Sequence, residues 1–128
     1  MRLIALTLLA IIPACADETV SGYADAEAIY RLVEIDGAAF AARATISFPE
    51  EGVARGEGPC NTWSATQTAP YPWIDLDAYA VTRRACPELP AEGVFLAALA
   101  EMSLAEVQGP VLILSNDKGR EMVFRADR

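Results

Sequence analysis

The sequence predicts a β-rich α+β domain, in which about seven or eight short, mostly antiparallel strands curl over a single α-helix. Short runs of branched and aromatic residues recur along the chain and are bounded by Gly, Pro, Asn and Asp, as in strands joined by turns. One stretch, after Cys86, has apolar residues at helical spacing. About 110 residues follow the apolar N-terminus, which is the size of one domain with one core.

Residues 1–16 have the pattern of a signal peptide, because Arg2 precedes an apolar run at 3–12 that is too short to span a bilayer. Two endings are open. The letters I-P-A-C resemble a lipobox, which predicts lipidation of Cys15 and attachment to a membrane. The letters A-C-A fit a cleavage site that releases a soluble protein beginning at Asp17. We favour lipidation.

Residues 17–28 are polar and acidic, and we expect a flexible tether there, followed by the domain at 29–128. The first strand is predicted at 29–35, ending in the turn Asp36-Gly37. Residues 44–48 alternate and predict a second strand. Its expected core face consists of Ala44, Ile46 and Phe48.

A turn is predicted at 49–52, and a strand that contains glycine at 53–58. Glycine inside a strand often marks a place where another backbone approaches closely.

Cys60 and Cys86 are the only cysteines that follow the N-terminal segment, and we expect them to form a disulfide if the chain is exported. Such a bond would stabilise the domain by roughly 3–4 kcal/mol in the chain-entropy model. The alternative is two reduced, buried thiols. A zinc site is not expected, because two cysteines without any histidine in the chain do not complete the usual ligand set.

Residues 62–72 read as a loop, and 73–80 as an alternating strand. The core face of that strand is expected to hold Ile74, Leu76 and Ala78. Its other face is expected to hold Trp73, Asp75, Asp77 and Tyr79. With the preceding aromatic of the loop, this face gives a candidate binding surface of Tyr71, Trp73, Asp75 and Asp77.

Asp75 and Asp77 allow three interpretations. They could be an acid/base pair beside aromatic residues that bind a sugar, or two of the six or more oxygen ligands that calcium needs. They could also be the solvated face of an outer strand, which we favour. Without histidine, no Ser-His or Cys-His arrangement exists. We therefore expect no catalytic residue, metal site or cofactor.

The helix is predicted after Pro87, with Glu88 and Glu92 favoured by the positive N-terminal dipole. Its apolar stripe is expected to contain Phe95, Leu96, Leu99 and Met102. Three strands follow, at 104–108, 111–115 and 120–125. The middle one is apolar on both faces, which places it at the centre of a sheet, and Met122 and Phe124 are expected to point inward.

The central segment resembles the META domain of HslJ-like bacterial envelope proteins. The residues that carry this resemblance are Gly56, Cys60, Asn61, Thr82 and Cys86. Further matches are Tyr30, Leu32, Ile35 and Gly37 upstream, and Phe95, Leu96 and Leu99 downstream. Departures from the pattern occur at Glu57, Pro59 and Ala65, so the resemblance leaves the local backbone there open. The resemblance spans about residues 29–124, and it implies the β-rich fold and a lipoprotein.

The net charge of −8 argues against nucleic acid as a partner, because the phosphates would be repelled. We expect a monomeric, non-catalytic protein of the cell envelope or periplasm. Its partners would be an unknown envelope protein and a membrane, reached through a lipid anchor on Cys15. The alternative is an inhibitor or binding module for an envelope hydrolase that uses the loop at 62–73 as a wedge. A carbohydrate-acting enzyme is a distant third.

Overall fold

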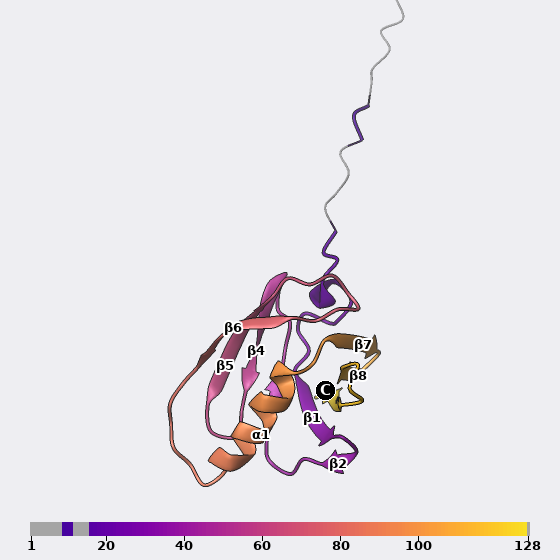
Figure 1. The fold of residues 1–128 in the computed structure, drawn as a ribbon. Coiled ribbons are helices and arrows are strands. Elements are labelled where there is room, and N and C mark those ends of the chain that lie inside the picture. Colours follow the sequence, from indigo (N-terminus) through magenta and orange to yellow (C-terminus); the bar gives the residue numbers. More distant parts are fainter. Residues whose placement is uncertain (1–8, 12–15, 128) are drawn as a thin grey trace, which may run out of the picture.

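The computed structural model describes residues 9–11 and 16–127, and these form nine strands, one α-helix and one short 3-10 helix (Figure 1). The predicted β-rich α+β fold is confirmed. No helix within the described ranges is long and apolar enough to cross a membrane. The elements are η1 (Val20–Gly22), β1 (Tyr30–Ile35), β2 (Ala38–Ala39), β3 (Thr45–Ile46), β4 (Gly52–Glu57), β5 (Thr62–Gln67), β6 (Leu76–Val81), α1 (Leu89–Ala100), β7 (Leu104–Gln108), β8 (Val111–Ser115) and β9 (Glu121–Ala126).

The strands form two antiparallel sheets that are joined at both margins. One sheet has the order β2-β1-β9-β8-β7, with β3 also paired to β1, and the other has the order β4-β5-β6. An isolated bridge between Ser47 and Arg55 connects the end of β3 to β4. A second bridge, between Trp73 and Leu104, connects the approach to β6 with β7. The sheets therefore form a nearly closed, barrel-like wall around one core.

The helix α1 packs into this wall with the apolar stripe that the sequence predicts. Phe95 and Leu99 are fully buried, Met102 is buried and Leu96 is half-buried. The ring of Phe95 lies 6.1 Å from that of Trp63, in an edge-on arrangement that aromatic pairs favour. The helix thus completes the core that both sheets share.

The predicted core face of the strand at 44–48 is confirmed, although β3 spans only Thr45–Ile46 and Thr45 is buried as well. The predicted close backbone approach at a glycine of β4 is also confirmed. Ala44, Ile46 and Phe48 are fully buried. A Cβ atom built on Gly56 would lie 2.0 Å from the carbonyl oxygen of Thr45. Only glycine fits there, because the two backbones pass without room for a side chain.

The loop predicted at 62–72 is wrong over its first half, because β5 occupies residues 62–67. This strand lies between β4 and β6 and alternates regularly between buried and exposed positions. Its outward residues are Thr and Ser, and its inward residues are Trp63, Ala65 and Gln67. The small polar residues of β5 and the two prolines that follow it are typical of a loop, so the sequence does not predict this strand.

The expected faces of β6 are correct up to Asp77 and wrong after it. Ile74 and Leu76 are buried as predicted, but Ala78 is exposed and Tyr79 is half-buried. The pairing of β6 with β5 shifts between these positions, so that Ala78 and Tyr79 lie opposite one residue of β5. This is a β-bulge, and Ala78 takes a positive φ of 51° in it. Because of the extra residue, the side chains after Asp77 point to the faces opposite to those predicted.

Residues 17–28 pack against the domain, in contrast to the expected flexible tether. Val20 is fully buried, and Thr19 forms a bridge with Pro70. The ring of Tyr23 stacks on that of Tyr71, with their centroids 4.2 Å apart. This segment has few hydrophobic residues, so its sequence does not predict packing. The packing depends on Pro70 and Tyr71, which are far away in the sequence.

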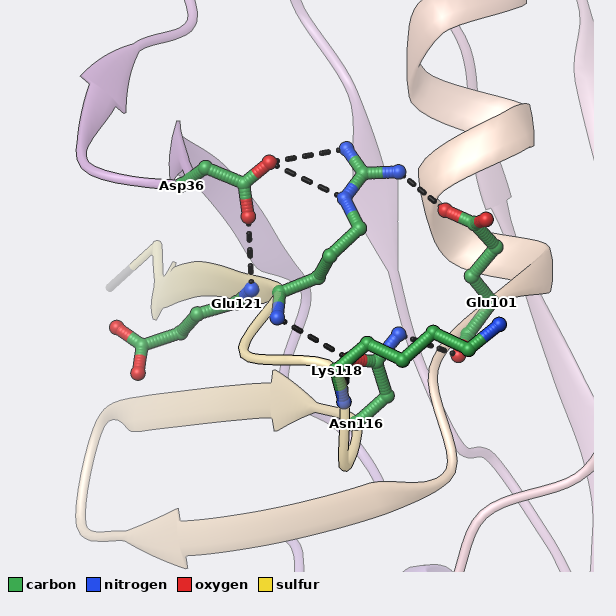
Figure 2. A network of polar contacts seen from close by, with 6 residues as sticks. Asp36, Glu101, Asn116, Lys118 and Glu121 are labelled. Atoms are coloured by element: carbon green, nitrogen blue, oxygen red, sulfur yellow. Dashed lines mark hydrogen bonds and ion pairs between the residues drawn. The ribbon is translucent and has the colours of Figure 1, made fainter.

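Arg120 ties the C-terminal end of α1 to two turns of the large sheet (Figure 2). Its Nε and Nη2 donate to Oδ2 of Asp36 at 3.1 and 3.0 Å, and its Nη1 pairs with Glu101. Asn116 Nδ2 donates to the carbonyl oxygen of Glu101 at 3.1 Å. A hydrogen bond from the backbone N–H of Glu121, followed by those from Arg120, lowers the pKa of Asp36. These groups are exposed, so the network fixes geometry more than it adds stability.

Two glycines provide a matched test of the close approach at β4. Gly56→Ala should destabilise the domain by several kcal/mol, because the new Cβ collides with a backbone oxygen that cannot move freely. Gly93→Ala, on an open face of α1, should raise stability by about 0.5–1 kcal/mol through helix propensity. Chemical denaturation of both variants measures the difference. Equal effects of the two substitutions would contradict the proposed backbone contact.

Candidate functional site

The side chain of Asn61 is the centre of a polar cluster between the start of β5, the segment after β6, and α1. Asn61 is 6% exposed. Its Oδ1 accepts hydrogen bonds from Thr82 Oγ1 at 3.0 Å and from the backbone N–H of Arg84 at 2.5 Å. Its Nδ2 donates to the carbonyl oxygen of Arg84 at 3.1 Å and to Oε2 of Glu92 at 2.7 Å. Every hydrogen-bonding position of the amide is therefore in use.

Glu92 completes this cluster from the first turn of α1. The side chain is buried, and its Oε1 accepts from the backbone N–H groups of Cys60 at 3.1 Å and Asn61 at 2.7 Å. With Asn61 Nδ2 on its other oxygen, the carboxylate receives three N–H donors. A buried carboxylate needs this degree of satisfaction to be tolerated.

This role of Glu92 differs from the one predicted from the sequence, in which its charge interacts only with the helix dipole. A signal was present, because Glu92 continues the buried stripe of Phe95, Leu99 and Met102 at a spacing of three residues. A charged residue at a position of the buried stripe requires a buried partner. The partner lies 31 residues away, so the sequence alone did not identify it.

The turn that precedes Asn61 is shaped around the same carboxylate. The N–H of Gly58 donates to the carbonyl oxygen of Asn61 at 2.6 Å. A Cβ atom at position 58 would lie 2.5 Å from Oε1 of Glu92. Gly58 therefore leaves space for the Glu92 side chain to reach the backbone.

A disulfide between Cys60 and Cys86 closes the cluster, as the sequence analysis predicts. The two Cα atoms are 5.8 Å apart, within the usual range for such a bond. Both residues are half-buried. The bond joins the turn before β5 to the segment that enters α1, and its expected contribution is roughly 3–4 kcal/mol.

The two cysteines also lie near Glu88, with possible ligand atoms of all three within 4.8 Å of one another. Among the described residues, this is the one group of three His, Cys, Asp or Glu side chains at such a spacing. The sulfurs are joined to each other, so neither offers the thiolate that binds a metal. The group is not a metal site in the oxidised protein.

Three shallow concavities surround the cluster. The first, of about 550 Å³, runs over β4, β5 and β6 and includes Arg43, Ser64 and Val81. Arg43, Arg55 and Glu57 are its charged residues, and Arg43 is paired with Glu57 at 3.0 Å and with Asp127 at 3.7 Å. The other two are both lined by Asn61, Thr82 and Arg84. Among the residues that line these concavities, the hydroxyls of Ser47 and Thr82 bond to the carbonyl oxygen of Arg55 and to Asn61 Oδ1, so neither is paired with a carboxylate.

The candidate binding surface is partly assembled at the other end of the domain. Trp73 is 55% exposed, as predicted, and Asp75 and Asp77 are exposed. Tyr71 is half-buried, and its hydroxyl accepts the N–H of Val107 at 3.1 Å. Asp77 Oδ1 accepts the N–H of Ala78, so this carboxylate stabilises the bulge. The arrangement matches the solvated face of an outer strand.

Trp63 is not a surface aromatic. It is 3% exposed, and its indole N–H donates to the carbonyl oxygen of Thr45 at 3.2 Å. Burial of Trp63 agrees with the expectation that this aromatic residue belongs to the core of a small domain.

Tyr79 has an unusual environment next to this region. Its hydroxyl is buried and has no hydrogen-bond partner among the residues that the structure describes. Burial, followed by the negative charges of Asp75 and Asp77, raises the pKa of Tyr79 to about 12. All three influences disfavour the phenolate.

Tyr79 should therefore make the domain sensitive to alkali. The unfolded chain loses this proton near pH 10, whereas the folded domain keeps it up to about 12, so stability should fall across that window. Tyr79→Phe should abolish this contribution and keep full stability at neutral pH, because the hydroxyl forms no bond that would be lost. Absorbance titration should show a transition near pH 12 in the wild-type protein that Tyr79→Phe lacks. Persistence of that transition in the variant would contradict this assignment.

Glu92→Gln tests the polar cluster with a nearly isosteric change. The new amide group would point its N–H donors at Asn61 Nδ2, which is also a donor, so we expect a loss of about 1.5–3 kcal/mol. Glu51→Gln, at an exposed turn position, should change stability by less than about 0.5 kcal/mol. Chemical denaturation measures both. If Glu92→Gln left the free energy of unfolding unchanged, the carboxylate would not be holding the cluster together.

Comparison with known proteins gives one family. The sequence pattern of the META domain matches residues 25–128. No match to a curated protein was found.

Solved structures share the fold. An NMR structure of a protein from Burkholderia xenovorans superposes with a TM-score of 0.62 at 19% identity, covering 98% of this chain and 99% of that one. A second NMR structure gives 0.58 at 18% identity, over 77% and 87% of the two chains. A crystal structure of a DUF4847 family protein from Bacteroides vulgatus gives 0.54 at 19% identity, over 64% and 57%. At these identities the likeness concerns the fold alone.

Proposed function

Because the chain belongs to the META domain family, we propose that it is a non-catalytic domain of the bacterial cell envelope, exported and held at a membrane by a lipid on Cys15. Its resemblance to HslJ-like proteins supports a role in envelope stress. Neither the family description nor the titles of the similar structures names an enzymatic activity.

The disulfide between Cys60 and Cys86 is the observation that carries the export proposal. Disulfides persist in oxidising compartments such as the periplasm and are rare in the cytosol of mesophiles. The N-terminal apolar run, which lies mostly outside the described residues, supplies the matching export signal. Cys15 also lies outside the described residues.

The use of the shared motif residues supports a non-catalytic role. The amide of Asn61 and the hydroxyl of Thr82 bond to each other and to backbone groups, and Glu92 is saturated by N–H donors. A catalytic site needs polar groups that are available to a substrate. In this domain the same groups are used to hold a turn, a strand and a helix together.

An inhibitor or binding module for an envelope hydrolase is the second candidate, favoured by the exposure of Trp73. Such a hydrolase would co-purify with the wild-type domain from an envelope extract and would be lost with Trp73→Ala.

Lipidation is tested by the N-terminus of the mature protein. In cells labelled with palmitate, the wild-type protein should carry label and fractionate with membranes, because a lipid on Cys15 would anchor it. Cys15→Ala should abolish both. A mature N-terminus at Asp17, without label, would show the soluble alternative to be correct.

A further inference from the structure

We propose that the end of the domain formed by η1 and the turn at 70–73 lies directly on the membrane surface, with Tyr23 and Trp73 in the phospholipid headgroup layer. This inference rests on the lipid anchor at Cys15 proposed above. The occupant of this surface is a zwitterionic phospholipid bilayer.

The first argument is the length of chain between the anchor and the domain. Asp17 is already fixed to η1, because its Oδ1 accepts the N–H and the hydroxyl of Thr19 at 2.8 and 2.6 Å. Thr19 is buried and paired with Pro70. Only Ala16 separates Asp17 from Cys15, and two residues span at most about 7 Å. This distance is comparable to one headgroup layer, which is about 5–8 Å thick.

The second argument is the side chains that surround this point of entry. The carbonyl oxygen of Glu18 accepts the N–H of Tyr71 at 2.7 Å, and the N–H of Trp73 bonds to Pro70 in the same turn. Tyr23 stacks on Tyr71 from η1. Tyr23 is 57% exposed and Trp73 is 55% exposed. Tyrosine and tryptophan prefer the membrane–water interface, where an apolar ring and a polar group are both accommodated.

The arrangement in Figure 1 agrees with this orientation. The chain leaves toward its N-terminus at the end where η1 and the segment between β5 and β6 lie. The segment from β6 to α1, which carries Thr82, Arg84 and Cys86, runs along the side of the domain toward the opposite end, where α1 begins. A short anchor therefore holds one end at the lipid and directs the polar cluster away from it.

The charge of the protein determines the kind of lipid. The net charge is −8, and Asp17, Glu18 and Asp75 lie close to the proposed contact in the sequence. Anionic lipids would repel this surface, so the acyl chains must supply the affinity and the aromatic rings the orientation. The contact should be stronger with zwitterionic phosphatidylcholine vesicles than with vesicles that contain anionic lipid.

The experiment uses the mature, acylated protein on phosphatidylcholine vesicles with and without bromine on the lipid chains near the headgroups. Bromine should reduce the emission of the wild-type protein, and Trp73→Phe should remove most of that loss, because the remaining Trp63 is buried in the core. A matched control moves the exposed tryptophan to the segment after β6, in a protein with Trp73→Phe and Arg83→Trp. Its emission should be unaffected by bromine.

Mass spectrometry of the same sample separates the two proposals. Absence of a lipid on Cys15 overturns both the anchor and the orientation. If the protein is acylated and bound to vesicles but bromine does not quench Trp73, the proposed orientation is wrong and the lipid anchor is still supported. Equal quenching of the Arg83→Trp control overturns the orientation as well.

Discussion

The hydrogen bonds between Glu92 and the Cys60-Asn61 backbone are the constraint on which the rest of this structure depends. They join the first turn of the single helix to the start of the central strand of the small sheet. Asn61 extends the connection to the segment after β6, and the disulfide repeats it covalently. Without these contacts, the helix that completes the core would be attached to the strand wall mainly by non-directional apolar packing.

Most of the fold could be predicted from the sequence, because local patterns determine it. The strands β7 and β8 lie at the predicted residues, and the stripe of Phe95, Leu99 and Met102 packs into the core. Alternation and helical spacing report which side of an element is apolar, and neighbouring residues suffice for that. The close approach at Gly56 was predictable for a similar reason, since a strand glycine has few other uses.

The errors share one physical origin, which is dependence on distant partners. The bulge at Ala78 and Tyr79 exists only in the register with β5, and the packing of Val20 depends on the segment around Pro70. Glu92 carries a charge whose partner is 31 residues away. In the candidate site, Trp73 could be assigned to the surface from its alternation with Ile74 and Leu76. The role of Asn61 could not be read from its neighbours, because its bonds go to Arg84 and α1.

The bulge at Ala78 and Tyr79 also affects whether two copies of the domain can pair through β6. Among the described strands, β6 pairs only with β5, so its other side is an edge of the small sheet. A regular edge is a template to which a second copy could add a strand, leading to aggregation. In β6 the extra residue breaks the even spacing of backbone donors and acceptors, and the exposed carboxylate of Asp77 stands beside it. Two copies of the domain that met at this edge would thus find a surface that does not propagate a sheet.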